Sequence, residues 1–337
     1  MENLLNALDL FKERKTLVIG DILLDYSIEG SAERLNPEIP AVPLIKVRDT
    51  DYRLGGAGNV ARNLASLGAG CCLFGQIGRD AGGEKIRELC DKERIRTYLV
   101  DSGRETPVKQ RLFSDGHYIV RVDFGENNLE PISPELERDL AEEVIKTINL
   151  YDLVIFSDYD KGIFRRDLAK RVIEASKEKG ILTLADPKPR NIYSFQGCDI
   201  IRPNRKEAEE ITGMRYNGKN LGEIARNLAE RTKSKYEVIT CGDDGAFAYH
   251  AESNISTIIP VKKVEIGDAT GAGDTFAAVL GLGIASGFNF EMAVRAANYA
   301  SALVVDKAGT AVTNVSELQN ALDEICVISS IKVISWI

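Results

Sequence analysis

Residues 268–275, with the sequence DATGAGDT, combine two acids with two closely spaced glycines and run directly into an apolar stretch over 276–285. Gly271 and Gly273 allow the backbone to turn tightly with its amides pointing outward. A buried helix is expected over 276–285, and its start adds partial positive charge at the same place. Gly271, Ala272 and Gly273 are therefore predicted to form a hole for an anion.

Asp274 lies at the mouth of this predicted anion hole. A carboxylate there could accept a proton from an attacking hydroxyl while the amides stabilise a transferring phosphoryl group. The alternative is a capped helix after a glycine turn, in which Asp274 only bonds free amides. A capping aspartate needs neither a second aspartate nor three small residues before it, so the catalytic interpretation is favoured.

A second glycine-rich segment, residues 54–63 (LGGAGNVARN), precedes a predicted helix. Residues 56–61 fit the G-x-G-x-x-A dinucleotide fingerprint, but residues 49–53 are polar and lack the look of the buried strand that this fingerprint follows. The amide of Asn59 offers both a donor and an acceptor, which fits a site close to a sugar. Gly56 and Asn59 are thus predicted to bind substrate, and a purely structural glycine turn is the alternative.

Polar segments follow three apolar runs, at residues 186–189 (DPKP), 202–207 (RPNRKE) and 240–245 (TCGDDG). Asn204 and Glu207 could hold Mg²⁺-bound water beside nucleotide phosphates, and the alternative is that Asn204 caps the following helix. All three segments are expected to open on the same edge of a sheet, because the carboxyl ends of parallel strands lie together.

The elements that position these residues follow an alternating order. Short apolar runs typical of buried parallel strands occur at 16–20, 153–157, 181–185, 199–202 and 236–240. Amphipathic helical stretches are found at 59–67, 83–92, 134–148, 167–179 and 221–231. This pattern predicts an α/β fold with a mostly parallel sheet covered by helices on both faces.

Two segments break the alternation, residues 27–47 and 107–123. Both contain β-type residues without an intervening helix, and the second has the turn signal Asp115-Gly116. They are predicted to form a small sheet that lies over the site as a lid and supplies the contact of a homodimer.

Composition narrows the class of protein. The 337 residues carry a formal net charge of -8 with a pI near 5.2, which argues against a nucleic-acid partner because such binding needs a basic face. The six cysteines lack zinc spacing and are expected to be reduced thiols of a cytoplasmic protein. No apolar run approaches the ~20 residues that span a bilayer, and the N-terminus lacks the order of a signal peptide. The P-loop motif and the protein-kinase motifs are also missing.

Taken together, these motifs resemble the ribokinase (PfkB) family of carbohydrate kinases over about residues 14–320. The resemblance implies a ribokinase-like three-layer sandwich over residues 1–325 with a small β lid, ATP as phosphoryl donor and Mg²⁺. The apolar tail over 326–337 has no assigned role. Arg205 and Lys206 depart from the smaller or neutral residues expected in the nucleotide motif.

Within this family, the chain looks most like the heptose-7-phosphate kinases. The segments that carry this resemblance are 20–25 (GDILLD), 34–40 (RLNPEIP), 43–47 (PLIKV), 106–111 (TPVKQR), 120–123 (VRVD), 157–162 (SDYDKG) and 186–188 (DPK). The resemblance implies phosphorylation of D-glycero-β-D-manno-heptose 7-phosphate at O1 in ADP-heptose synthesis for the lipopolysaccharide core. The alternatives are another sugar, phosphosugar or nucleoside kinase of the family, and a regulator that binds a sugar or nucleotide without catalysis. The bifunctional relatives continue into a nucleotidyltransferase domain, and this sequence stops before one.

The resemblance also implies roles for individual residues. Those expected on the sugar side are Asp25, Gly56, Asn59, Asp158 and Asp186, with Lys109, Arg111, Arg121 and Lys161 as cations for the substrate phosphate. Each cation taken alone is more often a solvated surface charge, and the four together beside the lid segments favour a phosphosugar. Those expected to serve ATP and Mg²⁺ are Lys188, Asn204, Arg205, Lys206, Glu207, Thr240, Gly242, Asp243, Gly245 and Asn298. Asp268 and Thr270, with backbone near Gly309, match a site for a monovalent cation such as K⁺.

Overall fold

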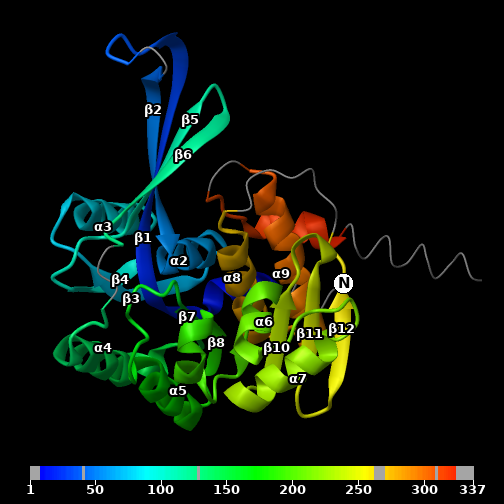
Figure 1. Ribbon diagram of the computed structural model, residues 1–337. Helices are drawn as coiled ribbons and strands as arrows, with labels where there is room; N and C mark the ends of the chain where they lie inside the picture. Colours follow the sequence, from blue (N-terminus) through cyan, green and yellow to red (C-terminus); the bar gives the residue numbers. More distant parts are fainter. Residues whose placement is uncertain (1–7, 40–41, 127–129, 262–269, 308–309, 324–337) are drawn as a thin grey trace, which may run out of the picture.

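The computed structural model describes residues 8–39, 42–126, 130–261, 270–307 and 310–323. Within these residues, the main sheet has the strand order β12-β11-β10-β9-β8-β7-β1-β3-β4 (Figure 1). Its strands are β1 (Lys15–Leu35), β3 (Gly70–Ile77), β4 (Arg96–Asp101), β7 (Leu153–Ser157), β8 (Leu182–Asp186), β9 (Ile200–Ile201), β10 (Tyr236–Thr240), β11 (Ala246–His250) and β12 (Ile255–Ile259). Neighbouring strands are parallel except for the β10–β11 and β11–β12 pairs, so the predicted mostly parallel sheet is confirmed.

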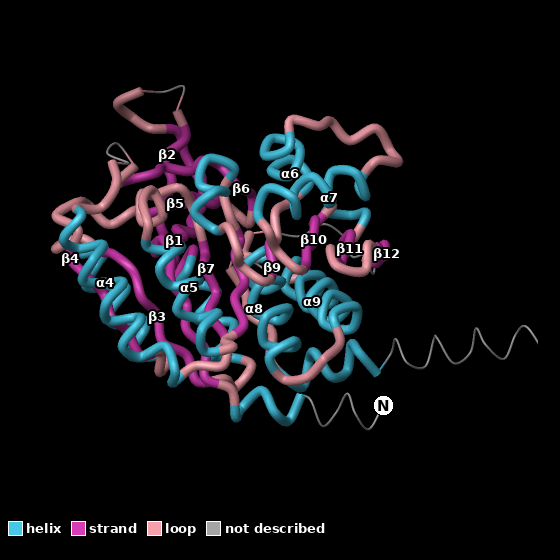
Figure 2. The backbone as a smooth tube through the Cα atoms, turned by 90° about the horizontal axis from the view of Figure 1, so that it is seen from below, coloured by secondary structure: helices cyan, strands magenta, loops and turns pink. Residues whose placement is uncertain are grey.

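Helices cover both faces of this sheet, as the view in Figure 2 shows. One face carries α2 (Ala57–Ser66), α3 (Ala81–Lys92), α8 (Ala272–Ala285) and α9 (Phe290–Val305). The other carries α4 (Pro134–Thr147), α5 (Leu168–Lys179), α6 (Arg205–Thr212) and α7 (Leu221–Thr232). The arrangement is the predicted three-layer sandwich.

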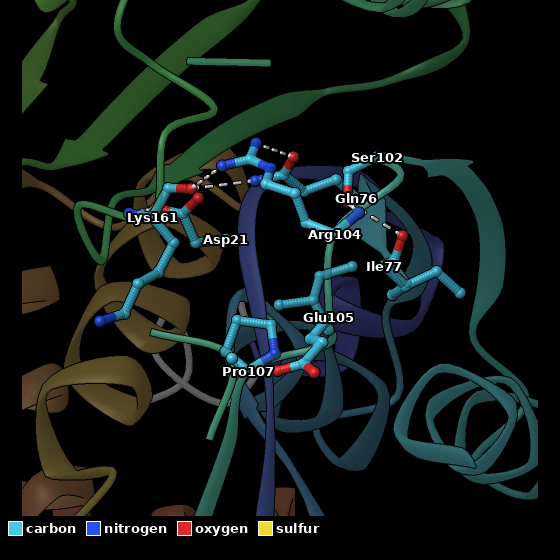
Figure 3. A pocket seen from close by; sticks show the side chains of 10 residues that line it. Asp21, Gln76, Ile77, Ser102, Arg104, Glu105, Pro107 and Lys161 are labelled. Carbon is cyan, nitrogen blue, oxygen red and sulfur yellow. Dashed lines mark hydrogen bonds between the residues drawn. The ribbon is translucent and has the colours of Figure 1, made fainter. Parts of the chain in front are cut away.

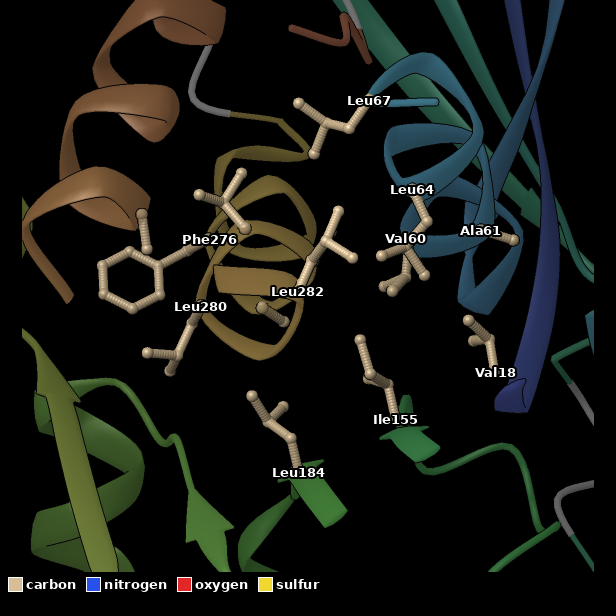
Figure 4. Close-up of a cluster of buried hydrophobic side chains, with 14 of the residues drawn as sticks. Val18, Val60, Ala61, Leu64, Leu67, Ile155, Leu184, Phe276, Leu280 and Leu282 are labelled. Atoms are coloured by element: carbon tan, nitrogen blue, oxygen red, sulfur yellow. The ribbon is translucent and has the colours of Figure 1, made fainter. Parts of the chain in front are cut away.

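Successive side chains of the central strands enter different cores because they alternate across the sheet. In β1, Val18 packs on the side of α2 and α8, while Leu17 and Ile19 pack on the side of α4 and α5. Figure 4 shows the first core, where side chains of α2 and α8 meet those of β7 and β8. A Cβ on Gly281 would lie 2.9 Å from Cδ2 of Leu153, so the glycine lets α8 pack closely on β7. This packing holds the start of α8 in place.

A second, smaller sheet forms the predicted lid. Strand β1 continues beyond the main sheet and pairs with β2 (Pro43–Gly56) on one side and β5 (Val108–Ser114) on the other. Strand β6 (His117–Phe124) pairs with β5 and completes the lid, which projects from the body at the top of Figure 1. Because β1 belongs to both sheets, the lid is joined to the core without a separate hinge segment.

Two further observations bear on the sequence predictions. No helix in the described part of the chain is both long and apolar enough to cross a membrane. The apolar tail over 326–337 lies outside the described residues.

Candidate active site

Helix α8 begins directly after Gly271, whose φ of 85° lies in the left-handed region that favours glycine. A Cβ on Gly271 would lie 2.7 Å from Nδ2 of Asn59, so a larger residue would push into the site. The first amides of a helix have no intrahelical acceptors, and together with the helix dipole they favour an anion. Gly271, Ala272 and Gly273 line one cavity with Asp274, as the predicted anion hole requires.

Asp274 is 3% exposed and accepts two hydrogen bonds from side chains. Nδ2 of Asn59 donates to its Oδ2 at 2.8 Å, and the hydroxyl of Tyr159 donates to its Oδ1 at 2.7 Å. Neither bond comes from a backbone amide, which disfavours the helix-capping alternative. Burial raises the pKa of Asp274 to about 6, although both hydrogen bonds act in the opposite direction. Such a carboxylate is ionised at neutral pH and can still accept a proton, as a general base must.

A cavity of about 720 Å³ opens beside the start of α8. Its volume lies in the range of roughly 300–1,000 Å³ that is usual for small-molecule pockets. The apolar part of the cavity wall is formed by Val261, Phe276, Ala302 and Val305. Residues expected to serve the nucleotide also line it, and they come from four separate segments: Lys188, Asn204, Glu207, Thr240, Gly242, Asp243, Gly245 and Asn298. The cavity therefore brings together residues that lie more than 100 positions apart in the sequence.

Two ion pairs form one wall of this cavity. Arg202 pairs with Asp186, and Nζ of Lys188 lies 2.6 Å from Oε1 of Glu207. Arg202 is 6% exposed, and its Cζ lies 5.9 Å from the centre of the ring of Phe276. Its Nε has no hydrogen-bond partner in the described ranges. Arg202 lies in the polar segment 202–207, but the sequence predicted no role for it. Its position directly before the Pro203-Asn204 step, at the end of β9, was the available signal.

Asn204 is the N-cap of α6 and forms a capping box with Glu207. Oδ1 of Asn204 accepts from the amide of Glu207 at 3.0 Å, and Oε2 of Glu207 accepts from the amide of Asn204 at 2.9 Å. The capping role considered for Asn204 is thus present. Both side chains still line the cavity, so their predicted contact with metal-bound water remains a prediction.

The neighbouring residues Arg205 and Lys206 do not line the cavity. Nη1 of Arg205 lies 2.9 Å from Oδ2 of Asp244, its guanidinium lies over the ring of Tyr216, and Lys206 is exposed. The structure therefore gives no support to the nucleotide contacts predicted for these two residues.

On the sugar side, Nη1 of Arg111 lies 2.5 Å from Oδ1 of Asp25, and both side chains are largely buried. Asn59 is fully buried, and within the described part of the chain its Oδ1 has no hydrogen-bond partner, so its acceptor is available next to Asp274. Gly56 makes its close contact with the protein itself, since a Cβ there would lie 2.4 Å from the carbonyl oxygen of Asp21. This contact favours the structural alternative for Gly56.

Asp158 is 1% exposed and does not line the large cavity. Its oxygens accept from the amides of Asp160 and Lys188 and from the side chain of Asn191. Burial and the neighbouring Asp21 raise its pKa to about 7. These contacts leave little of the carboxylate for a sugar, so the sugar contact expected of Asp158 gains no support from the structure.

Three of the four predicted phosphate cations have a carboxylate partner. Besides Arg111, Arg121 pairs with Asp123 at 2.8 Å and Lys161 with Glu126 at 2.7 Å. Lys109 has no such partner among the described residues, and its Nζ lies 5.4 Å from the ring centroid of Tyr159. Burial lowers the pKa of Lys109, although the nearby carboxylates of Asp25 and Glu126 act in the opposite direction.

Comparison with known proteins identifies the family of this chain. The family model for pfkB family carbohydrate kinases matches residues 13–317. This chain belongs to the pfkB family of carbohydrate kinases. It is 33% identical over 314 residues to the bifunctional protein HldE of Nitrobacter winogradskyi, and 38% identical over 313 residues to that of Caulobacter vibrioides. These alignments cover 92% and 91% of this chain but only 64% and 63% of the relatives, so the chain spans less than two thirds of their length.

Solved structures share the fold of this pfkB-family kinase. Phosphofructokinase-2 from Escherichia coli in complex with potassium superposes with a TM-score of 0.76 at 19% identity, over 93% of this chain and 99% of that chain. The tetrameric inhibited form of the same protein gives a TM-score of 0.75 at 17% identity over the same shares of the two chains.

As a pfkB-family carbohydrate kinase, the protein is a phosphotransferase, and the fold implies ATP and a divalent metal. No group of three or more His, Cys, Asp or Glu side chains that could hold a metal occurs in the described ranges. Mg²⁺ usually keeps several waters and binds through one or two carboxylates plus substrate phosphates. Glu207 on the cavity wall therefore fits a Mg²⁺ ion that arrives with the nucleotide and keeps its waters.

The predicted site for a monovalent cation involves Asp268, Thr270 and the backbone near Gly309. Asp268 and Gly309 lie outside the described residues, while Thr270 directly precedes Gly271. The site stays a prediction.

Proposed function

We propose that this pfkB-family kinase transfers the γ-phosphoryl group of ATP to O1 of D-glycero-β-D-manno-heptose 7-phosphate, giving the 1,7-bisphosphate. The observation that carries the chemistry is the position of Asp274, whose carboxylate lies at the start of α8 on the wall of the 720 Å³ cavity. The resemblance of residues 157–162 and 186–188 to heptose-7-phosphate kinases, and the similarity to the HldE proteins, support the choice of sugar.

In this proposal, Asp274 accepts the proton of the O1 hydroxyl as O1 attacks the γ-phosphorus. The bond between O1 and phosphorus forms, the bond from phosphorus to the β–γ bridging oxygen breaks, and ADP leaves with that electron pair. The amides at the start of α8 and the guanidinium of Arg202 stabilise the charge on the transferring group. Mg²⁺, with Glu207 in contact through water, would neutralise part of the phosphate charge.

Lys109 supports a phosphorylated acceptor. A protein of net charge -8 needs local positive charge to bind a substrate that carries a dianionic group. Arg111, Arg121 and Lys161 each form a direct ion pair with a carboxylate, whereas Lys109 forms no such pair among the described residues and lies beside the ring of Tyr159, with Asp25 and Glu126 acting on its ammonium at longer range. Its half-buried ammonium would therefore be the principal group that reads the substrate phosphate, with Arg121 and Lys161 at longer range.

Asp25 and Asn59 would contact sugar hydroxyls. The Oδ1 of Asn59 is a buried acceptor that finds no partner among the residues the structure describes, and a hydroxyl donor would satisfy it. Asp186 would orient Arg202, and Asp158 would hold the loop after β7 in place. K⁺ near Thr270 remains part of the proposal for the monovalent-cation site.

The lid is proposed to form a homodimer contact. Strand β6 is exposed along its length, and large apolar side chains are exposed on the lid strands, which is unusual for a surface without a partner. These side chains are Leu35, Val47, Tyr118, Ile119, Val120, Val122 and Phe124.

The cysteines in the described ranges are all free thiols, which supports a reducing, cytoplasmic compartment for the protein.

A panel of acceptors with ATP tests the proposed function. The purified full chain would be assayed with heptose 7-phosphate, the unphosphorylated heptose, fructose 6-phosphate and nucleosides, with products followed by mass. Product from heptose 7-phosphate alone, lost in Asp274→Asn, supports the proposal. Turnover of a different acceptor identifies another kinase of the family, and calorimetric binding without turnover identifies a non-catalytic regulator.

A further inference from the structure

Tyr159 lies where the sugar side and the nucleotide side of the site meet. Its hydroxyl donates to Oδ1 of Asp274 at 2.7 Å. Its ring lies 5.4 Å from Nζ of Lys109, on lid strand β5, and 5.7 Å from Nζ of Lys188, on the wall of the large cavity. One side chain therefore contacts the lid, the nucleotide cavity and the carboxylate that acts as base.

A buried carboxylate fixes the backbone that carries Tyr159. Asp21 is 1% exposed and accepts from the amides of Tyr159 and Lys161, both at 3.0 Å, and of Ile163 at 3.4 Å. On the other side of this loop, the carbonyl oxygen of Lys161 accepts from Nε2 of Gln76 at 3.1 Å (Figure 3). Breaking these bonds would leave buried polar groups unpaired, so the loop is held firmly.

A second buried carboxylate ties the same loop to the nucleotide side. Oδ1 of Asp158 accepts from the amide of Asp160 at 2.8 Å, and Oδ2 accepts from the amide of Lys188 at 2.9 Å. Nδ2 of Asn191 donates to both oxygens of Asp158, at 3.1 and 3.0 Å. The position of the Tyr159 hydroxyl is thus set by two buried acids that do not themselves reach Asp274.

We propose that Tyr159 is a positioning residue for the general base, holding Asp274 in the orientation in which it receives the proton of the acceptor hydroxyl. Asn59 holds one carboxylate oxygen and Tyr159 holds the other. Each oxygen can accept two hydrogen bonds, so these donors leave room for the substrate hydroxyl. The inference rests on the proposed role of Asp274 as base.

The phenol also helps to keep Asp274 ionised, because a donor to the charged form of a carboxyl lowers its pKa. Burial and the adjacent Asp274 raise the pKa of Tyr159 well above its usual range, so the phenol remains a donor at working pH. Two other charged groups act on Asp274: Asp186 raises its pKa and Arg202 lowers it. Lys109 and Lys188 face the ring of Tyr159.

Tyr159→Phe isolates this role, because it removes one oxygen and keeps the ring that packs between the elements. The dependence of kcat/KM on pH would be measured for the full chain with ATP and the acceptor used by the wild type. The wild-type acid limb is expected near pH 6, following the pKa of Asp274. In Tyr159→Phe, the limb is expected to move up by about one unit, which lowers kcat/KM about 10-fold on the acid side of both midpoints, about 3-fold at pH 6.5 and by almost nothing at pH 8.5.

Tyr193→Phe is the matched control, since Tyr193 is 59% exposed and lies away from the site, and its profile should follow the wild type. A second readout needs no substrate: the Asp274 carboxyl, labelled with ¹³C and assigned by its loss in Asp274→Asn, is titrated by NMR. Tyr159→Phe should raise its midpoint by a similar amount. An unchanged acid limb together with an unchanged titration overturns the proposal. If the wild type is inactive on every phosphosugar, the proposed function is wrong instead. The titration would still test whether the hydroxyl of Tyr159 stabilises the ionised carboxylate of Asp274.

Discussion

Replacing Asp274 by Asn is expected to remove most of the activity and to make the protein more stable at neutral pH. The new amide keeps the shape of the side chain and can keep both contacts, with its oxygen accepting from Asn59 and its NH₂ donating to the hydroxyl of Tyr159. The substitution therefore removes a buried charge without opening a cavity.

The magnitude follows from the pKa of Asp274. Burial raises it from 3.8 to about 6, a difference of about two units, which corresponds to about 3 kcal/mol at roughly 1.4 kcal/mol per unit. The folded protein holds this proton more tightly than the unfolded chain does. The wild type therefore loses stability relative to Asp274→Asn as pH rises from about 4 through about 6. We expect the variant to unfold with a free energy higher by up to about 3 kcal/mol at pH 8, and by almost nothing at pH 4.

Urea unfolding followed by circular dichroism at several pH values between 4 and 8 measures this difference. Asp139→Asn, an exposed substitution on α4, is the control and should show no such pH dependence. Activity of Asp274→Asn should fall by roughly 10²-fold to 10⁴-fold in kcat, as for the loss of a general base. A variant less stable than the wild type at pH 8 would refute the electrostatic reasoning, and a loss of activity below tenfold would refute the role as base.

Three further substitutions test other parts of the site. Gly271→Ala is expected to lower kcat/KM by at least ~10-fold, because its Cβ would lie 2.7 Å from Nδ2 of Asn59. Gly213→Ala controls for the backbone strain and should keep its kinetics, since Gly213 has a φ of 73° and a Cβ there would meet no described atom within 4 Å. Lys109→Ala should raise KM for a phosphorylated acceptor about 10-fold or more, and equal effects on the unphosphorylated analogue would show that Lys109 does not read the phosphate. Val120→Glu places a charge on the exposed strand β6, so the dimer should dissociate and the mass measured by light scattering should halve. A wild type that is already monomeric would contradict the lid dimer.

The main-sheet strands that are buried on both faces could be predicted closely from the sequence. Residues 153–157 and 236–240 coincide with β7 and β10, since burial on both faces requires an unbroken apolar run. Strands β3 and β4 were not predicted. β3 contains two glycines and a glutamine, and β4, an edge strand, is polar at its start and end, so neither shows a continuous apolar pattern.

The structure of the lid could be predicted from the sequence only in part. The sequence indicated strands over 27–47 and 107–123, but not that β1 runs unbroken for 21 residues from the core into the lid. Strand β1 pairs with β2 in antiparallel order and with β5 in parallel order, and the chain separates β1 from β5 by more than 70 residues. Such pairing depends on contacts between distant segments, which local residue patterns do not contain.

The sequence by itself determined the chemistry that this protein carries: a glycine turn before a helix, an aspartate in the first turn, and polar residues after apolar strands are local features with local physical causes. Only the tertiary structure decided which of those residues meet. Asn59 and Asp274 lie 215 positions apart yet share a hydrogen bond, Arg202 pairs with Asp186, and Tyr159 reaches the base. These contacts depend on how strands and helices pack, because burial and charge interactions act through space between groups that the chain order keeps apart.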